Sequence, residues 1–202
     1  MEKDAQDPDA ALIPELVEGR EYAFRRLWET YARRIYRFVR LRSRSDEDAE
    51  EITVDTFVRC HKGIGKFKGQ SKLATWLFRL ADNAAADYYH RKHVLPNVVA
   101  LEDVSGVSVV NAGWIGHALA ADPHEQALLK ERRHNFFRVL SQLSRDHQRV
   151  IILRAIEGFS LTETEIILRR SEGAVKMLFL RASQELARLI RTDAYFTVRG
   201  GR

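Results

Sequence analysis

Apolar residues recur at steps of three and four between positions 24 and 38. The residues at these steps are Phe24, Leu27, Trp28, Tyr31, Ile35 and Phe38. This spacing predicts an α-helix that buries one face. Arginines occupy the other side of the same helix, at Arg25, Arg26, Arg33, Arg37 and Arg40. The first expected element is therefore an amphipathic helix with a basic outer face.

Two further helices are predicted before position 93. Ser45 precedes three acidic residues at 46–48, and such a serine caps free helix amides while the acids oppose the helix dipole. This second helix is expected to end near Lys62. Glycines at 63, 65 and 69 break the periodicity, and three lysines make the break basic. A third helix is expected from about Lys72 to about Arg91, which completes a first helical domain over 22–93 after an N-terminal extension of residues 1–21.

The stretch 94–123 separates this block from a second helical block. It holds Pro96, three glycines and scattered valines with no sustained period, so we expect a flexible linker. A second domain is predicted over 124–191, and its first helix covers Glu125 to Leu143. Residues 192–202 form a short tail that ends in Arg-Gly-Gly-Arg, and we expect it to be disordered. The predicted fold class is all-α, with two small helical domains.

The second block contains the pattern of a helix-turn-helix. Residues 150–156 are predicted to be helical and to end at Gly158, and Ser160 with Glu163 forms a capping box that opens a short helix. Ser171 then caps a longer helix with an apolar stripe. In such a motif the second helix enters the DNA major groove with its first turns at the bases. A plain helical hairpin with a basic solvated face is the alternative.

Composition and charge narrow the class of protein. Lys and Arg number 33 against 28 Asp and Glu, a net charge of +5 that favours polyanionic partners. The single Cys60 excludes an internal disulfide, and no apolar run predicts export or membrane insertion. We therefore expect a cytoplasmic protein. His61, His90 and His93 show no metal or catalytic spacing, so we predict neither a cofactor nor an enzyme.

Four segments resemble extracytoplasmic-function (ECF) sigma factors of the bacterial sigma-70 family. Segment 146–182, which includes HQRVIILRAIEGFSLTETEIILRRSEGAVKMLFLRA, resembles their promoter-binding region 4. The segments AFRRLWETYARRIYRFV, DEDAEEITVDTFVR and FKGQSKLATWLFRLADNAAADYYHRK resemble region 2, in the expected order. The resemblance covers both blocks and leaves the linker and the termini outside. It implies a sigma factor that binds core RNA polymerase and directs promoter recognition, DNA melting and transcription initiation.

The resemblance implies three binding sites. The acidic segment from Asp48 to Phe57 matches the part that docks on the largest polymerase subunit, and the second-largest subunit is also an implied partner. The implied docking residues are Asp48, Glu50, Glu51 and Asp55. Clustered carboxylates suit electrostatic steering, although a solvated first helical turn would look the same. In the family an anti-sigma protein commonly covers such surfaces, and it is a further implied partner.

The other two implied sites bind promoter DNA. Segment 67–92 matches the part that captures the opened strand of the minus-ten element, where bases need cations and planar groups. The expected residues are Lys66, Lys68, Lys72, Trp76, Arg79, Asn83, Asp87, Arg91 and Lys92. Taken alone, Trp76 fits a core position better than a base platform, and Arg91 and Lys92 are expected beyond the helix end, at duplex phosphate. The minus-thirty-five element is expected to contact Arg169, Arg170, Ser171, Glu172, Lys176, Met177 and Arg181.

Several positions depart from the family pattern. Arg169 stands where relatives commonly have glycine, and because a non-glycine residue with positive φ is strained, a different turn is expected. Thr164 replaces an apolar support position and Val54 replaces a glutamine. Met177, Leu178 and Leu180 replace polar or basic residues, so they are expected to contact thymine methyls or a protein partner.

Two other functions compete with the sigma factor interpretation. A free-standing helix-turn-helix regulator would bind operators without polymerase, but it leaves the acidic segment unexplained. An enzyme acting on nucleic acid would need a catalytic constellation, and the GxG at Gly63 to Gly65 lacks the rest of a phosphate-binding signature.

Overall fold

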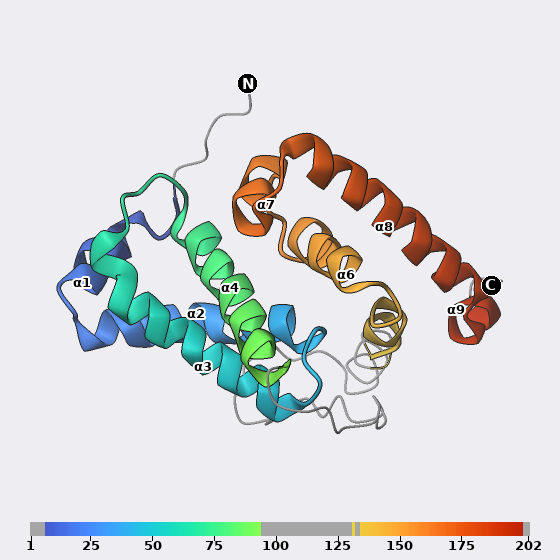
Figure 1. The fold of residues 1–202 in the computed structure, drawn as a ribbon, viewed down its shortest axis with the longest axis horizontal. Coiled ribbons are helices and arrows are strands. Elements are labelled where there is room, and N and C mark those ends of the chain that lie inside the picture. The colour runs from blue at the N-terminus through green and yellow to red at the C-terminus, as the bar shows by residue number, and fades with distance from the viewer. Residues whose placement is uncertain (1–6, 94–130, 132–133, 200–202) are drawn as a thin grey trace.

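The computed structural model describes residues 7–93, 131 and 134–199. The described residues form helices and connecting turns, without a strand. Figure 1 shows two groups of helices that lie against each other, with α1 to α4 in one group and α6 to α9 in the other. The predicted linker 94–123 and the first part of the predicted helix 125–143 lie outside the described residues.

Three long helices form most of the first group. They are α2 (Glu21–Arg40), α3 (Asp46–Gly63) and α4 (Leu73–His93). The predicted cap of α3 is confirmed, because the Ser45 hydroxyl accepts a hydrogen bond from the Asp48 amide at 3.1 Å. The apolar stripe of α2 packs against α3 and α4. Leu27, Ile35 and Phe38 are fully buried at the centre of this core.

The N-terminal residues add to this core. The short η1 (Ala10–Leu12) and α1 (Ile13–Val17) contribute the buried Leu12 and Leu16. Asp7 Oδ2 accepts a hydrogen bond from the amide of Leu73 at 2.7 Å, so a residue 66 positions away caps the start of α4. The described part of the extension 1–21 therefore helps to fix α4 in place.

The second group is built from shorter helices around α8. It contains a helical segment at 134–140, then α6 (Arg145–Ile151), the π-helical turn η3 (Ile152–Ile156), α7 (Leu161–Leu168), α8 (Glu172–Thr192) and α9 (Ala194–Arg199). The predicted end at Gly158 is confirmed, because this glycine has a φ of +75°. Glycine reaches this left-handed region without a steric penalty.

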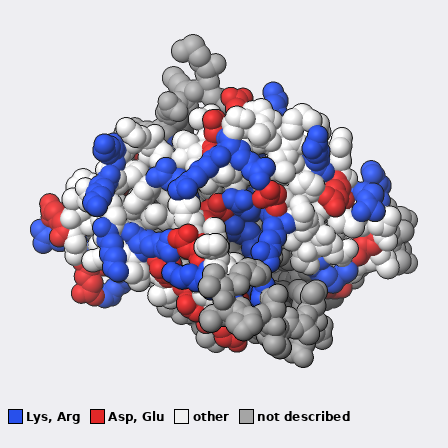
Figure 2. Space-filling view, in the orientation of Figure 1, with Lys and Arg blue, Asp and Glu red and all other residues white. Residues whose placement is uncertain are grey.

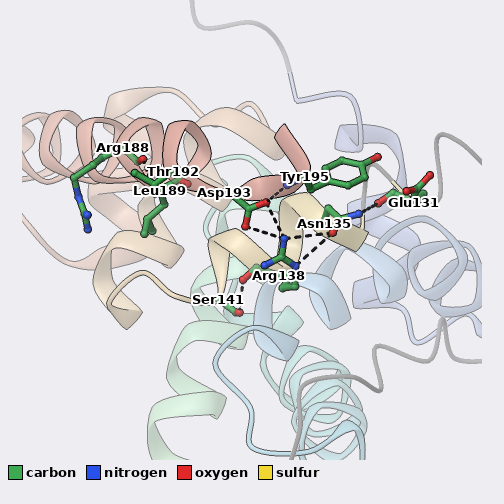
Figure 3. A network of polar contacts seen from close by, with 9 residues as sticks. All are labelled: Glu131, Asn135, Arg138, Ser141, Arg188, Leu189, Thr192, Asp193 and Tyr195. Carbon is green, nitrogen blue, oxygen red and sulfur yellow. Dashed lines mark hydrogen bonds and ion pairs between the residues drawn. The ribbon is translucent and has the colours of Figure 1, made fainter. Parts of the chain in front are cut away.

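The expected disorder of the C-terminal tail is wrong for residues 193–199. Asp193 receives two hydrogen bonds from Arg138 Nη2, at 3.0 and 2.8 Å, and its Oδ1 accepts the amide of Tyr195 at 3.1 Å. Figure 3 shows Arg138 between Asn135 and Asp193, which joins segment 134–140 to the end of α8. The sequence shows Asp193 but not the distant Arg138 that anchors it.

The two groups of helices share a buried interface. The ring of Phe78 on α4 meets the ring of Phe159 at a centroid distance of 4.8 Å. Arg149 on α6 donates from Nε to Asp82 Oδ1 on α4 at 2.9 Å, and the side chain of Asp82 is only 10% exposed. The two predicted helical domains therefore pack closely in this structure.

Candidate nucleic-acid interface

The helix-turn-helix begins with a well-formed cap. The Ser160 hydroxyl accepts from the Glu163 amide at 3.1 Å, and the Glu163 carboxylate accepts from the Ser160 amide at 2.7 Å. This is the predicted capping box, which satisfies two free amides of α7. The hydroxyl of the fully buried Thr164 donates to the Ser160 carbonyl at 2.8 Å. A polar residue at this support position is thereby accommodated.

Arg169 makes the turn between α7 and α8. Its backbone has φ 53° and ψ 45°, in the left-handed region, and its amide donates to Glu165. The expectation that a non-glycine residue would change the turn is therefore wrong. Arg169 itself takes up the left-handed conformation, at a cost of about 1–2 kcal/mol.

The seven residues expected at the minus-thirty-five element are all exposed. Ser171 caps α8 by accepting from the Ala174 amide at 3.4 Å. Arg170 Nη2 pairs with Asp146 at 2.5 Å, an exposed contact that a phosphate oxygen can replace. The first turns of α8 thus offer polar and basic groups to solvent, as a groove-facing helix requires.

Apolar residues also face outward on α8. Met177 is 49% exposed and Leu180 is 50% exposed. Leu178, in contrast, is half-buried and packs against the core. The expected outward contact therefore applies to Met177 and Leu180 and not to Leu178.

 A basic cavity lies beside the start of α4. Its volume is about 270 Å³. The residues around the α4 cavity are Lys66, Phe67, Lys68, Gln70, Ser71, Trp76, Arg79 and Ile166. Four of the expected minus-ten residues therefore meet at one place. Figure 2 shows Lys and Arg side chains across the middle of the molecule on the face it presents.

Trp76 and Lys72 have partners within the protein. Trp76 is 8% exposed, lies 5.2 Å from the ring of Phe67 between centroids, and covers Gly63. This burial agrees with the core position, while the minus-ten role of the Trp76 ring stays a prediction. Lys72 Nζ pairs with Glu163 Oε1 on α7 at 3.0 Å.

The C-terminal half of α4 carries the remaining minus-ten residues. Asn83 is half-buried and Asp87 is exposed. Asp87 Oδ2 accepts from Arg59 Nη1 on α3 at 2.5 Å. Arg91 and Lys92 lie inside α4, which continues to His93, so their expected place beyond the helix end is wrong.

Asp48 does not lie on an exposed acidic surface. It is 4% exposed and accepts hydrogen bonds from Lys92 at 2.5 Å, Tyr88 at 2.8 Å and Tyr89 at 3.1 Å. Burial alone raises a carboxyl pKa, but the bonds from Lys92 and the tyrosines outweigh it, so the pKa of Asp48 lies below its ordinary value. Asp48 therefore joins α3 to α4, and its expected exposure is corrected.

The other three acids of the segment are accessible to different degrees. Glu50 and Glu51 are exposed, whereas Asp55 is half-buried and accepts from Arg59 Nε at 2.9 Å. An apolar groove of about 360 Å³ continues along the same side of α3. Its lining residues are Phe24, Trp28, Val54, Phe57, Val58, His61 and Lys62.

Sequence reasoning missed this groove. Val54 is 51% exposed and Val58 is 42% exposed, which is unusual for two valines one turn apart. With Glu50 they form an outward stripe at steps of four along α3. The signal present in the sequence was an apolar pair on the side opposite the buried Ile52 and Thr56.

In the part of the chain that the structure describes, no cluster of His, Cys, Asp and Glu has the arrangement of a metal site. No helix within 7–93 or 134–199 combines the length and the apolar character needed to cross a membrane.

Comparison with known proteins identifies the family to which both helical groups belong. Residues 27–94 match the model of sigma-70 region 2, and residues 133–186 match sigma-70 region 4. The chain is 31% identical over 182 residues to the ECF RNA polymerase sigma factor SigM of Mycobacterium tuberculosis, covering 90% of this chain and 84% of that protein. It is 30% identical over 195 residues to the ECF RNA polymerase sigma factor BldN of Streptomyces coelicolor, covering 94% and 70%.

Solved structures show the same fold. CnrH in complex with the cytosolic domain of CnrY aligns with a TM-score of 0.64 at 22% identity, over 92% of this chain and 99% of that one. The sigma factor RpoE of Bartonella quintana, in complex with the anti-sigma factor NepR, aligns with a TM-score of 0.59 at 21% identity, over 84% and 98%.

The fold and the paired regions define a transcription factor of the sigma-70 type. The chain belongs to the ECF subfamily of the sigma-70 family. It is an alternative sigma factor that directs transcription initiation, and not a free-standing regulator. The family is one of non-enzymatic transcription factors.

Proposed function

We propose that this sigma factor uses three separate surfaces, one for core RNA polymerase and two for promoter DNA. The observation that carries the proposal is that three surfaces are accessible at once. The first turns of α8 are exposed in the second helical group, and the first group holds the basic cavity beside α4 and the acidic and apolar outward side of α3. We assign no catalytic step to this chain, because polymerase supplies the phosphoryl transfer. Its place of action is the bacterial cytoplasm, where polymerase and promoter DNA meet.

The polymerase-docking surface is the outward side of α3. Glu50 and Glu51 supply charge for steering toward a basic partner, and Val54 and Val58 supply apolar area that becomes buried on docking. Asp55 stands at the edge of this surface with Arg59. Asp48 is left out, because its carboxylate is already occupied inside the protein.

The two DNA surfaces divide the work of promoter recognition. The first turns of α8 and the adjacent arginines meet duplex DNA at the minus-thirty-five element, with Lys176 and Arg181 toward phosphates. Lys66, Lys68 and Arg79 hold the backbone of an opened strand at the minus-ten element. Asn83 and Asp87 lie farther along α4 and offer an amide and a carboxylate to base edges.

An anti-sigma protein is the expected regulator of this chain. The sigma factor RpoE, which has this fold, is in complex with the anti-sigma factor NepR, and CnrH is in complex with the cytosolic domain of CnrY. The outward side of α3 and the first turns of α8 are exposed in this chain and are therefore available to a protein of that kind.

Affinity for core RNA polymerase tests the docking surface. Replacing Glu50→Lys together with Glu51→Lys is expected to weaken binding about tenfold or more, because the steering charge is reversed. The matched control reverses Glu18, just after α1, and Glu21, at the start of α2, which are both exposed and lie outside the surface. Equal loss in both double variants, or loss in neither, would contradict the assignment.

A second pair of variants separates apolar contact from charge. Val54→Ala with Val58→Ala removes exposed methyl groups, so the free energy of unfolding should change little while polymerase affinity falls. An unchanged affinity would remove the groove from the docking surface.

A further inference from the structure

The interface between the two helical groups involves the residues expected to capture the opened strand. Lys72, an expected strand contact, is paired with Glu163 on α7 at 3.0 Å. Ile166 of α7 forms part of the wall of the cavity that contains Lys66, Lys68 and Arg79. A DNA strand and α7 therefore compete for the same space and for the same cation.

Glu157 forms a second anchor of this interface. Its side chain is only 2% exposed, and its carboxylate accepts from Arg34 Nε at 2.7 Å and from Arg37 Nη2 at 3.1 Å. Both arginines lie on α2, more than 100 positions away in sequence. A carboxylate buried this deeply needs such partners, because an unpaired buried charge is strongly unfavourable.

A third anchor has the opposite polarity. Arg149 on α6 reaches Asp82 on α4, which also accepts from Arg42 Nη1 at 2.7 Å. Each helical group thus supplies both a carboxylate and an arginine to the ion pairs that surround the contact between Phe78 and Phe159. This complementarity fixes one relative arrangement of the groups rather than a loose association.

The recognition helix is left outside this interface. The residues from Arg169 to Lys176 are exposed, apart from the buried Val175. The closed arrangement consequently occupies Lys72 and places Ile166 beside Arg79, while Lys66 and Lys68 stay exposed and the first turns of α8 stay accessible to duplex DNA. The Glu163 carboxylate on α7 occupies Lys72, the cation that a strand phosphate would otherwise contact.

We propose that the α6–α7 side of the second helical group is an intramolecular docking surface for the strand-capturing face of α4, and that the two must separate before an opened strand binds. The inference rests on the proposed function only for the identity of the strand-binding residues. The docking itself rests on the contacts of Glu157, Glu163 and Arg149. Strand affinity of the free chain is reduced by the fraction of molecules that are closed.

Small-angle X-ray scattering and strand binding test this proposal on the full chain. Glu157→Gln keeps the shape of the side chain and removes its charge, so the radius of gyration should increase. Affinity for a fluorescent pool of single-stranded oligonucleotides should rise about tenfold. Glu21→Gln is the matched control, because the Glu21 side chain is 87% exposed and its ion pair is with Arg25 on the same helix.

Changing the two arginines that pair with Glu157 shows whether the ion pair, and not a local disturbance at residue 157, holds the chain closed. Arg34→Gln with Arg37→Gln should open the chain as Glu157→Gln does, while Arg25→Gln with Arg26→Gln should not. Circular dichroism verifies that each variant keeps its helix content. The proposal is overturned if the native chain is already extended in solution, or if both interface variants keep the native radius and strand affinity.

Run-off transcription with core polymerase separates failure of the intramolecular docking from failure of the proposed function. Transcripts from the native chain together with unchanged scattering of the variants would overturn the docking alone. Opening of the variants without any transcript from the native chain would leave the docking in place and overturn the proposed function.

Discussion

Replacing Asp48→Asn distinguishes a structural carboxylate from a docking one. The native side chain is 6% exposed and accepts three hydrogen bonds from residues of α4. A hydrogen bond to a charged group is worth about 1.5–3 kcal/mol, and a neutral amide keeps part of each bond from the tyrosines. Lys92 is 47% exposed, so its share is screened by solvent. We expect a loss of about 2 kcal/mol in the free energy of unfolding.

Urea denaturation followed by circular dichroism measures this loss. For a chain of this length the same change lowers Tm by about 4–8 °C. The pKa of Asp48 is below its ordinary value of 3.8, so its contribution is full above that pH and disappears as the pH falls through the folded value. The difference between native and variant protein should therefore shrink in acid.

Polymerase affinity supplies the other half of the test. The folded Asp48→Asn variant should bind core polymerase with nearly the affinity of the native chain. In the exposed comparison variant, Glu50→Gln, the free energy of unfolding should change by less than about 0.5 kcal/mol. A variant of native stability that fails to bind polymerase would refute the structural role of Asp48.

Three further outcomes are expected. Burial alone would raise the pKa of Glu163, but hydrogen bonds from the Ser160 amide and Lys72 outweigh it and hold this pKa below 4.5. The ion pair between Lys72 and Glu163 should therefore persist above that pH and weaken below it. X-ray scattering across pH 3–6, roughly the range in which a carboxyl group titrates, should show expansion of the chain in acid, and no expansion would contradict this. Arg169→Gly should raise the free energy of unfolding by about 1 kcal/mol, because glycine adopts the left-handed turn without strain, and a lower urea midpoint would contradict it. Burial raises the pKa of Cys60 to about 12, so its thiol should react with iodoacetamide far more slowly in native protein than in urea, and equal rates would contradict the burial.

Local signals predicted much of the helical architecture. The stripe of α2, the Ser45 cap and the capping box at Ser160 depend on residues a few positions apart, so periodicity and capping rules identify them. The exposed residues at the start of α8 follow from the same reasoning. These features need no knowledge of distant contacts.

The features that the sequence did not predict depend on contacts between residues far apart in the chain. Asp48 looks like an ordinary first-turn acid until Tyr88, Tyr89 and Lys92 are brought over it by the packing of α3 on α4. The anchoring of Asp193 by Arg138 is equally invisible in the sequence. Arg169 shows the converse, because a strained residue is kept where the surrounding helices determine the turn.

Run-off transcription with bacterial core polymerase and a library of promoter DNA shows whether this chain initiates transcription through the outward side of α3. We expect specific transcripts from the native chain, none above core polymerase alone from the Glu50→Lys, Glu51→Lys variant, and native amounts from the matched Glu18, Glu21 reversal. The absence of any transcript that depends on the native chain, or equal transcription by all three proteins, would contradict it.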